Sequence, residues 1–149
     1  MAGLYFEQFS VGQTFVHEIR RTVTDMDNIL FSALTYNPAA VHIDHEYAKS
    51  TEFGKPLMNS IFTLGLVIGL SVQDTTLGTT VGNLGMEDTK FPRPVFAGDT
   101  IHVQCEVVEA RLSRNRPGRG LVRTRNEVVK QDGSVALTYT PLRLVKCRD

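Results

Sequence analysis

The longest stretch of this chain without a charged residue runs from Leu57 to Gln73, and it restricts the folds that the sequence can adopt. Its apolar side chains recur at helical spacing on nearly every side, and a helix of that kind must be buried nearly all round. The stretch is at the lower length limit for crossing a bilayer and carries polar residues at Asn59 and Ser60. We therefore predict a buried central helix over residues 57–72.

Four segments after this helix alternate between apolar and polar residues as strands do. They span residues 79–89, 99–113, 121–131 and 135–146. Asp132-Gly133 is a strong tight-hairpin signal between the last two, and another strand is expected over residues 15–21. One long helix followed by an antiparallel meander is an α+β arrangement, and 149 residues suit a single domain, 1–149. Sheet edges of this kind are commonly covered by a second copy, so we expect a homodimer.

A shorter helix is predicted upstream, where Thr24 can cap the N-terminus and Asp25 and Asp27 favour the first turn. Its apolar residues at helical spacing would form a buried face. They are Met26, Ile29, Leu30, Ala33 and Leu34. Asn37-Pro38 ends this helix, because the residue before a proline is pushed away from helical angles. A polar elbow follows at residues 37–44, and Asp44 can cap a short helix over residues 45–50.

The charge balance argues against two classes of partner. Lys+Arg and Asp+Glu each number 16, so no net field favours nucleic acid or an anionic membrane. Residues 1–7 show no basic region followed by an apolar core, and Cys105 and Cys147 are expected to be reduced thiols of a cytoplasmic protein. Because no His or Cys lies near either cysteine at zinc-ligand spacing, no metal site is expected.

The elbow carries residue types suited to acyl-thioester chemistry. His42 can move protons near neutral pH, and a nearby helix start at Asn59-Ser60 can aim backbone N–H groups at a developing oxyanion. Asn59 has two possible roles, capping the helix or touching a substrate. The sequence leaves both open.

Three segments in this order resemble the MaoC-like, (R)-specific enoyl-CoA hydratases of the hotdog fold. Residues 5–12 look like the family's opening, and residues 37–44 resemble its motif Asp-x-Asn-Pro-x-His-x-Asp. Residues 91–99 are similar to its Pro-Val-x-x-Gly-Asp segment. The resemblance covers nearly the whole chain. It implies a hydro-lyase with an antiparallel sheet wrapped around one long helix, which hydrates a 2-enoyl-CoA or dehydrates a 3-hydroxyacyl-CoA.

By the same resemblance, His42 is the catalytic base and acid. The family's Asp falls on Asn37 if the spacing from His42 is kept, or on Thr35 if the Asn-Pro pair is matched. Neither side chain can act as a carboxylate base, but either can position a water by hydrogen bonding. We expect Asn37 to orient that water.

The resemblance further implies that the Ser60 backbone N–H holds the thioester oxygen, and that Asn59 and Pro94 contact the substrate. The expected partner is an acyl-CoA, and no cofactor is expected beyond the CoA of the substrate. A branch of the family that shares the Asn-Pro-x-x-x-His pattern is linked to short, branched or dicarboxylic acyl-CoAs such as mesaconyl-CoA.

Two other functions stay open. The same fold hosts acyl-CoA thioesterases, although the helix start in this chain lacks an acid. The replaced Asp also allows a non-catalytic acyl-CoA-binding or regulatory protein.

Overall fold

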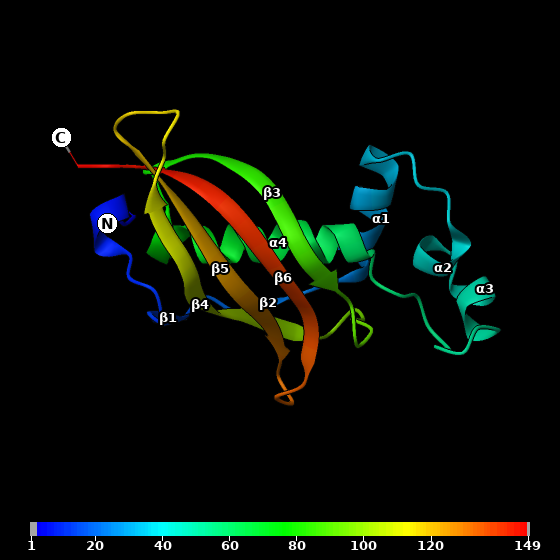
Figure 1. The fold of residues 1–149 in the computed structure, drawn as a ribbon. Helices are drawn as coiled ribbons and strands as arrows, with labels where there is room; N and C mark the ends of the chain where they lie inside the picture. Colours follow the sequence, from blue (N-terminus) through cyan, green and yellow to red (C-terminus); the bar gives the residue numbers. More distant parts are fainter. Residues whose placement is uncertain (1–2, 149) are drawn as a thin grey trace.

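An antiparallel sheet curves around one long helix, α4 (Ser60–Thr75), in the computed structural model, which describes residues 3–148 (Figure 1). Neighbouring strands follow the order β1-β4-β5-β6-β3, and β2 pairs with the start of β4. The strands are β1 (Thr14–Val16), β2 (Arg21–Thr22), β3 (Thr80–Lys90), β4 (Thr100–Leu112), β5 (Arg119–Lys130) and β6 (Val135–Lys146). The predicted α+β fold is confirmed, and each long strand begins and ends within two residues of its expected bounds.

The main core lies between α4 and the concave side of the sheet. Val67 and Leu70 of α4 belong to one apolar cluster with buried residues of three strands. Those residues are Ile101, Val103, Val128, Ala136, Leu137 and Tyr139. Along residues 100–107 of β4 every second residue is buried and those between are partly exposed, which is the pattern of a strand packed on one face only.

The start of α4 differs from the prediction. The helix begins at Ser60 rather than at Leu57, because the Asn59 side chain accepts hydrogen bonds from the N–H groups of Ile61 and Phe62. An asparagine in this position satisfies backbone donors that no preceding turn can reach. The capping role that the sequence allowed for Asn59 is therefore confirmed.

The burial of α4 also differs from the prediction. Ile61 has 59% of its surface exposed, and Gly65 and Gly69 lie exposed on the same side of the helix. A Cβ added at either glycine would meet nothing within 4 Å. The sheet of one chain covers one side of α4, so the opposite side stays open to solvent or to another chain.

The expected strand over residues 15–21 is divided into β1 and β2. Between them, the ring of His17 is almost completely buried, with its Nδ1 3.0 Å from Asp74 Oδ2 at the end of α4. Its Nε2 lies 3.8 Å from Cys105 Sγ. His17 thus fastens this segment to the last turn of α4, and the strand alternation resumes only at β2.

The helix α1 (Asp25–Leu34) is capped as predicted. Thr24 Oγ1 accepts from the Asp27 N–H, and Asp27 Oδ2 accepts from the Thr24 N–H. Two hydrogen bonds from Arg21, of 2.8 and 2.7 Å, are the main cause that lowers the pKa of Asp27 to about 2. The carboxylate therefore stays charged near neutral pH and ties the helix start to β2.

The predicted buried face of α1 is wrong. Its apolar residues Met26, Ile29, Leu30 and Leu34 keep between 48% and 72% of their surface exposed. The side chains that α1 buries are polar, Asn28 and Ser32. The reason is its position: α1 lies beyond the end of the sheet, away from the strands that could cover it (Figure 1).

Two short helices, α2 (Ala40–Ile43) and α3 (His45–Lys49), complete a helical extension at this end of the molecule (Figure 1). Asp44 caps α3 as predicted, since its Oδ1 accepts from the N–H groups of Glu46 and Tyr47 at 2.9 Å each. A 3-10 turn, η1 (Phe6–Gln8), lies at the opposite end. Within residues 3–148, none of the helices is long and apolar enough to cross a membrane.

Candidate functional site

A buried asparagine on α1 holds three segments together at the start of α4. Asn28 Nδ2 donates to the carbonyl oxygens of His42, at 2.7 Å, and Leu57, at 2.9 Å. Its Oδ1 accepts from the Asn59 N–H at 2.9 Å. Buried polar groups without partners are costly, so an amide that satisfies three of them fixes their positions. Asn28 thereby sets α2 and the start of α4 in a defined relation.

His42 on α2 has one ring nitrogen left for chemistry. Its Nδ1 lies 2.8 Å from the carbonyl oxygen of Leu57. Since a carbonyl can only accept, Nδ1 carries a hydrogen, and in the neutral ring Nε2 is then the nitrogen with the free lone pair. The contact with Leu57 thus holds the ring in the tautomer that a general base requires.

Asn37 lies in the turn between α1 and α2. The turn begins at Tyr36, which has a left-handed φ of 55°, and the Asn37 N–H donates to the Ser32 carbonyl at 2.9 Å. Asn37 Oδ1 accepts from the Ala39 N–H at 3.0 Å, as in an Asx turn. Its Nδ2 makes no hydrogen bond with residues 3–148, so this donor remains for a water or ligand.

The first N–H group of α4 is not used within the chain that the structure describes. Asn59 Oδ1 accepts from Ile61 and Phe62, and the Thr63 N–H makes the first helical bond, 3.1 Å long, to the Asn59 carbonyl. This leaves the Ser60 N–H without a hydrogen bond among residues 3–148. It stands at the positive end of the helix macrodipole, where a negatively charged oxygen is stabilised.

The loop before β4 places Pro94 beside this helix start. Met58 N–H donates to the Val95 carbonyl at 2.9 Å, and Leu57 forms a short antiparallel bridge with Phe96. These bonds join the residues just before α4 to those just after Pro94. The two segments therefore lie side by side, joined by backbone hydrogen bonds.

The Gly98-Asp99 pair, in the segment that resembles the family, stabilises the turn at the end of this loop. Gly98 has a φ of +96°, which favours glycine. Burial alone would raise the pKa of Asp99, but hydrogen bonds from Lys130, Gln131 and the Phe96 N–H outweigh that effect and lower it. With its carboxylate fully engaged by three donors, Asp99 fixes the turn.

A cavity of about 260 Å³ opens at this junction. Its wall combines the start of α4, the residues before it, the loop before β4 and the start of β6. The wall is apolar apart from Ser60, Thr63 and Arg93. Among the described residues that line it, Arg93 alone is charged.

The structure brings two residues expected from the sequence, Ser60 and Pro94, onto the wall of this cavity. His42 adjoins it through Leu57, which lines the cavity and accepts the hydrogen bond from the ring. Asn37 lines a different cavity, of about 430 Å³, between α1 and α2. The elbow residues thus lie beside the helix start but do not share one enclosed space with it in a single chain.

Two other candidates have structural partners. Asn59 is 5% exposed, and its side-chain oxygen is used in the helix cap, so a contact with substrate stays a prediction. Thr35, the alternative position for the family's Asp, donates to the Phe31 carbonyl at 2.8 Å and ends α1.

Sequence reasoning missed Asn28 and Arg93. Asn28 is a polar residue of an amphipathic helix. Its spacing of four from Ser32 places both side chains on one face, and this was the sequence signal that could have indicated a buried polar face. Arg93 lies within the segment that resembles the family, but only the folded chain shows that it lines the cavity. Both depend on contacts between segments far apart in sequence.

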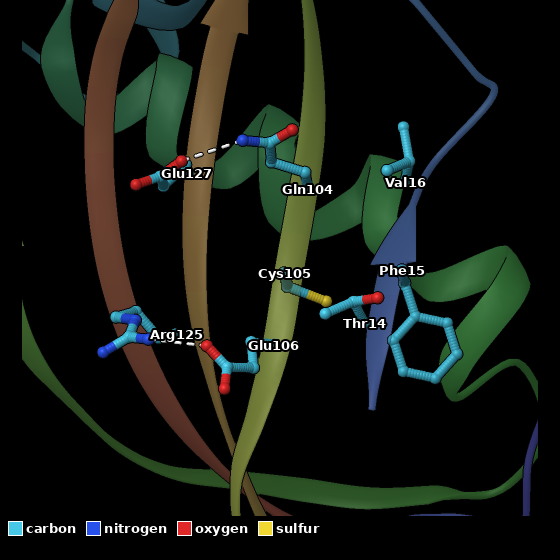
Figure 2. Close-up of a pocket in the computed structure, with 8 residues that line it drawn as sticks. All are labelled: Thr14, Phe15, Val16, Gln104, Cys105, Glu106, Arg125 and Glu127. Carbon is cyan, nitrogen blue, oxygen red and sulfur yellow. Dashed lines mark hydrogen bonds and ion pairs between the residues drawn. The ribbon is translucent and has the colours of Figure 1, made fainter. Parts of the chain in front are cut away.

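A third cavity, of about 350 Å³, lies on the outer face of the sheet across β1, β4 and β5 (Figure 2). Its charged side chains are engaged with one another or with amides: Arg125 Nη2 lies 2.6 Å from Glu106 Oε2, and Gln104 donates to Glu127 at 2.8 Å. Burial raises the pKa of Cys105 to about 11, so its thiol stays protonated near neutral pH. These features favour a structural role. Within residues 3–148, no group of three or more His, Cys, Asp or Glu could hold a metal ion.

Comparison with known proteins matches residues 7–131 to the family model described as a MaoC like domain. Mesaconyl-CoA hydratase from Cereibacter sphaeroides is 30% identical over 148 residues, which cover 99% of this chain and 43% of that protein. Beta-methylmalyl-CoA dehydratase from Chloroflexus aurantiacus is 31% identical over 148 residues, which cover 99% of this chain and 41% of that protein. The chain thus spans less than half the length of these two relatives.

Solved structures are similar over almost the whole chain. A monoamine oxidase regulatory protein from Archaeoglobus fulgidus matches with a TM-score of 0.88 at 32% identity, covering 100% of this chain and 98% of that one. A Mycobacterium tuberculosis protein with a double hotdog fold matches with a TM-score of 0.87 at 23% identity, covering 98% of this chain and 45% of that one. The hotdog fold implied by the sequence resemblance is confirmed.

Replacing Asn28 with Ala should weaken the junction, because the His42 carbonyl and the Asn59 N–H would lose their hydrogen bonds to this side chain and the Leu57 carbonyl would keep only the contact with His42 Nδ1. We expect the free energy of unfolding to fall by about 2–4 kcal/mol, measured by urea denaturation followed by circular dichroism. Asn115→Ala, in the exposed turn between β4 and β5, is the control and should change it by less than about 0.5 kcal/mol. Equally small effects of both substitutions would contradict the role assigned to Asn28.

Proposed function

The chain belongs to the MaoC-like domain family, and on that premise we propose that it catalyses the reversible hydration of a 2-enoyl-CoA, or dehydration of the corresponding 3-hydroxyacyl-CoA. The proposal depends most on Ser60, whose N–H is unpaired within residues 3–148 and which lines a cavity that His42 adjoins through Leu57. Relatives named as a hydratase and a dehydratase, at about 30% identity, support the same class of reaction.

His42 and Ser60 would divide the reaction between them. His42 Nε2 takes a proton from a water, whose oxygen adds to C3 of the enoyl chain. The C2=C3 electron pair moves toward the thioester, and the oxygen that becomes negative is held by the Ser60 N–H. The imidazolium then returns its proton to C2, so protons balance over the cycle. Dehydration follows the same steps in reverse, and the reaction needs no cofactor beyond the CoA of the substrate.

Asn37 is assigned the orientation of the attacking water. Its free Nδ2 can donate to the water oxygen, but an amide cannot accept the proton, so His42 is the sole base. General acid–base catalysis contributes about 10²–10⁴-fold, so the loss of a carboxylate partner reduces the rate without removing the reaction.

A short or branched acyl chain fits the cavity best. Its volume of about 260 Å³ is below the range of roughly 300–1,000 Å³ that is typical of sites for larger ligands. Pro94 and the apolar residues around it would contact the acyl group, while Asn59 acts through the cap that it forms on α4.

We further propose that the chain forms a homodimer paired through β3. β3 is the last strand in the sheet order, and it exposes Val81 and Leu84 by 43% and 52%. A long open edge that exposes apolar side chains is usually covered by another chain. The exposed side of α4, which carries Ile61, offers a second apolar surface for the same partner.

The catalytic role of His42 can be tested with crotonyl-CoA and mesaconyl-CoA, following both loss of the conjugated thioester and release of free thiol. Double-bond loss should fall by about 10²–10⁴-fold in His42→Ala, because the only base is removed. His45→Ala is the matched control, since that side chain is exposed on α3, and it should keep activity near that of the native chain.

The same assay separates the other two functions. Release of thiol without hydration would replace the hydratase by a thioesterase. Saturable binding of both thioesters with neither chemical change would indicate a non-catalytic acyl-CoA-binding protein. An activity of His42→Ala equal to that of the native chain would remove His42 from the mechanism.

The oxyanion role of Ser60 can be tested by deleting a single N–H. Proline is well tolerated at the first position of a helix, and Asn59 with ψ of 125° already has the backbone angle that precedes proline. Ser60→Pro should therefore keep the fold but lower kcat by about 10²–10³-fold. Ser60→Ala keeps the N–H and should stay close to the native rate. A similar loss in both variants, with unchanged circular dichroism, would show that the hydroxyl and not the backbone matters.

Pairing through β3 predicts a mass in light scattering of twice that of one chain. Leu84→Lys places a charge on the open edge, and it should shift the particle toward the mass of a single chain. A charge at Leu112, also exposed but at the end of the β4–β5 hairpin, should leave the mass unchanged. A native chain that is monomeric at micromolar concentration would contradict the proposal.

A further inference from the structure

We propose that a basic cluster at one end of the sheet binds the phosphates of a CoA thioester whose acyl group lies in the site of the partner chain. The basic cluster consists of Arg114 and Arg116 in the turn between β4 and β5, Arg119 at the start of β5 and Lys146 at the end of β6. This inference rests on the proposed function and on the proposed pairing through β3. It adds the residues that each chain contributes to the site of the other.

Two members of the basic cluster are held directly opposite each other in the sheet. Arg119 of β5 pairs with Lys146 of β6 in the register of the two strands. Like charges in this position repel each other and destabilise a sheet. Elsewhere on the same hairpin a facing pair joins opposite signs, as Glu106 and Arg125 do at 2.6 Å. The repulsion between Arg119 and Lys146 is relieved when an anion binds beside them.

Hydrogen bonds to the backbone hold these two cations in place without using all their donors. Arg119 Nη1 donates to the Gly118 carbonyl at 2.7 Å, and Lys146 Nζ donates to the Gly78 carbonyl at 3.0 Å. A guanidinium has five N–H donors and an ammonium has three, so each keeps donors for a ligand. Within residues 3–148, the basic cluster forms no ion pair. It is therefore a fixed positive surface with free donors, which suits phosphate oxygens.

The basic cluster lies far from the site of its own chain. Figure 1 shows the turn between β4 and β5 near the chain termini, at the end of the molecule opposite the helical extension α1–α3. The bond from Lys146 to Gly78 places the cluster beside the residues that follow α4. The candidate site lies at the other end of this helix, and its 16 residues span about 24 Å. A thioester in the site therefore has the basic cluster of its own chain about one helix length away.

The proposed dimer brings the basic cluster of one chain toward the site of the other. Within a chain, Gly120 of β5 lies beside Val145 of β6, which lies beside Thr80 at the start of β3. A two-fold axis near the middle of β3 places this start opposite the partner's Lys90, at the end of its β3. Three strand spacings of about 4.8 Å then separate the cluster from that residue, about 14 Å in all. The partner's Phe91 follows and lines the cavity, so the pantetheine arm of CoA can span the gap.

The phosphates of CoA fit the basic cluster better than a larger polyanion does. Lys+Arg and Asp+Glu each number 16 in the chain, so the positive charge is local and the molecule has no broad positive field. Such a field is what attracts nucleic acid or an anionic membrane. The diphosphate and the ribose phosphate of CoA form a compact polyanion, which a small group of arginines can bind through paired N–H donors.

Crotonyl-CoA and crotonyl-pantetheine test the proposal, because they share the acyl group and the pantetheine arm and differ in the phosphates and the nucleotide. Arg114→Gln combined with Arg116→Gln should lower kcat/KM for crotonyl-CoA by roughly 10-fold at low salt, as expected for lost hydrogen bonds between charged groups. The value for crotonyl-pantetheine should stay unchanged. The difference should shrink at high salt, because exposed charges are screened. An equal loss for both thioesters would overturn the proposal.

Arg111→Gln combined with Arg125→Gln is the matched control. It removes the same charge from the same hairpin, but Arg111 and Arg125 pair with Glu109 and Glu106. The ratio of kcat/KM between the two thioesters should stay that of the native chain. A loss as large as that in the Arg114 and Arg116 variant would show that total charge, and not the basic cluster, attracts CoA.

Mixed dimers test whether the basic cluster serves the partner. One chain carries His42→Ala, and the other carries Arg114→Gln and Arg116→Gln. The intact His42 then belongs to the chain without the two arginines, and it faces the intact cluster of the other chain. We expect kcat/KM for crotonyl-CoA, per intact His42, to equal that of the native dimer. The weakened value of the arginine variant, or a native chain that is monomeric, would overturn the contribution in trans.

Binding of CoA without an acyl group, measured by calorimetry, keeps the test independent of turnover. Weaker binding of CoA by the Arg114 and Arg116 variant than by the native chain supports the basic cluster even if no thioester is hydrated, an outcome that would reject the proposed reaction alone. Equal binding of CoA by both would overturn the cluster, whereas hydration that depends on His42 would leave the proposed reaction in place.

Discussion

The hydrogen bonds of Asn28 are the interaction on which the arrangement of the site depends. A single buried amide on α1 binds the backbone of His42 and of two residues in the segment before α4, Leu57 and Asn59. Two of these bonds satisfy backbone groups, the His42 carbonyl and the Asn59 N–H, and the third adds to the contact that the Leu57 carbonyl makes with His42, so the junction has one favourable arrangement. Packing of the sheet on α4 fixes the position of the helix, whereas Asn28 fixes the position of His42 and of the residues just before the first turn of α4.

The groups proposed for chemistry are those that this network leaves unsatisfied. His42 uses Nδ1 in the fold and keeps Nε2, and Asn37 uses Oδ1 and keeps Nδ2. The Ser60 N–H is the backbone donor that the Asn59 cap passes over. In each case a structural bond on one atom orients the neighbouring free atom. The proposed chemistry therefore relies on groups whose neighbouring atoms are fixed by hydrogen bonds of the fold.

Local signals in the sequence were sufficient for the four long strands and the helix caps. Thr24, Asp44 and Asn59 cap helices through bonds to residues two or three positions ahead, which a linear pattern can reveal. The face of α1 was not predictable in this way, because hydrophobic spacing gives the side that could be buried, not whether a strand is near enough to cover it. Arg93 and Asn28 act across long sequence separations, so their roles depend on the folded chain.

Tyr36 shows a cost that the elbow imposes on the domain. A left-handed φ of 55° is unfavourable for a residue with a side chain by about 1 kcal/mol, and Tyr36 is 95% exposed, so packing within the chain offsets little of it. Domains are stable by only about 5–15 kcal/mol, so a fixed loss of this kind is appreciable. A glycine would adopt the same angle without strain, but it would also let the link between α1 and His42 flex. Tyr36 thus lowers the free energy of unfolding slightly but keeps the link between α1 and His42 rigid. A substitution that removes the strain at Tyr36 should therefore raise stability and lower activity.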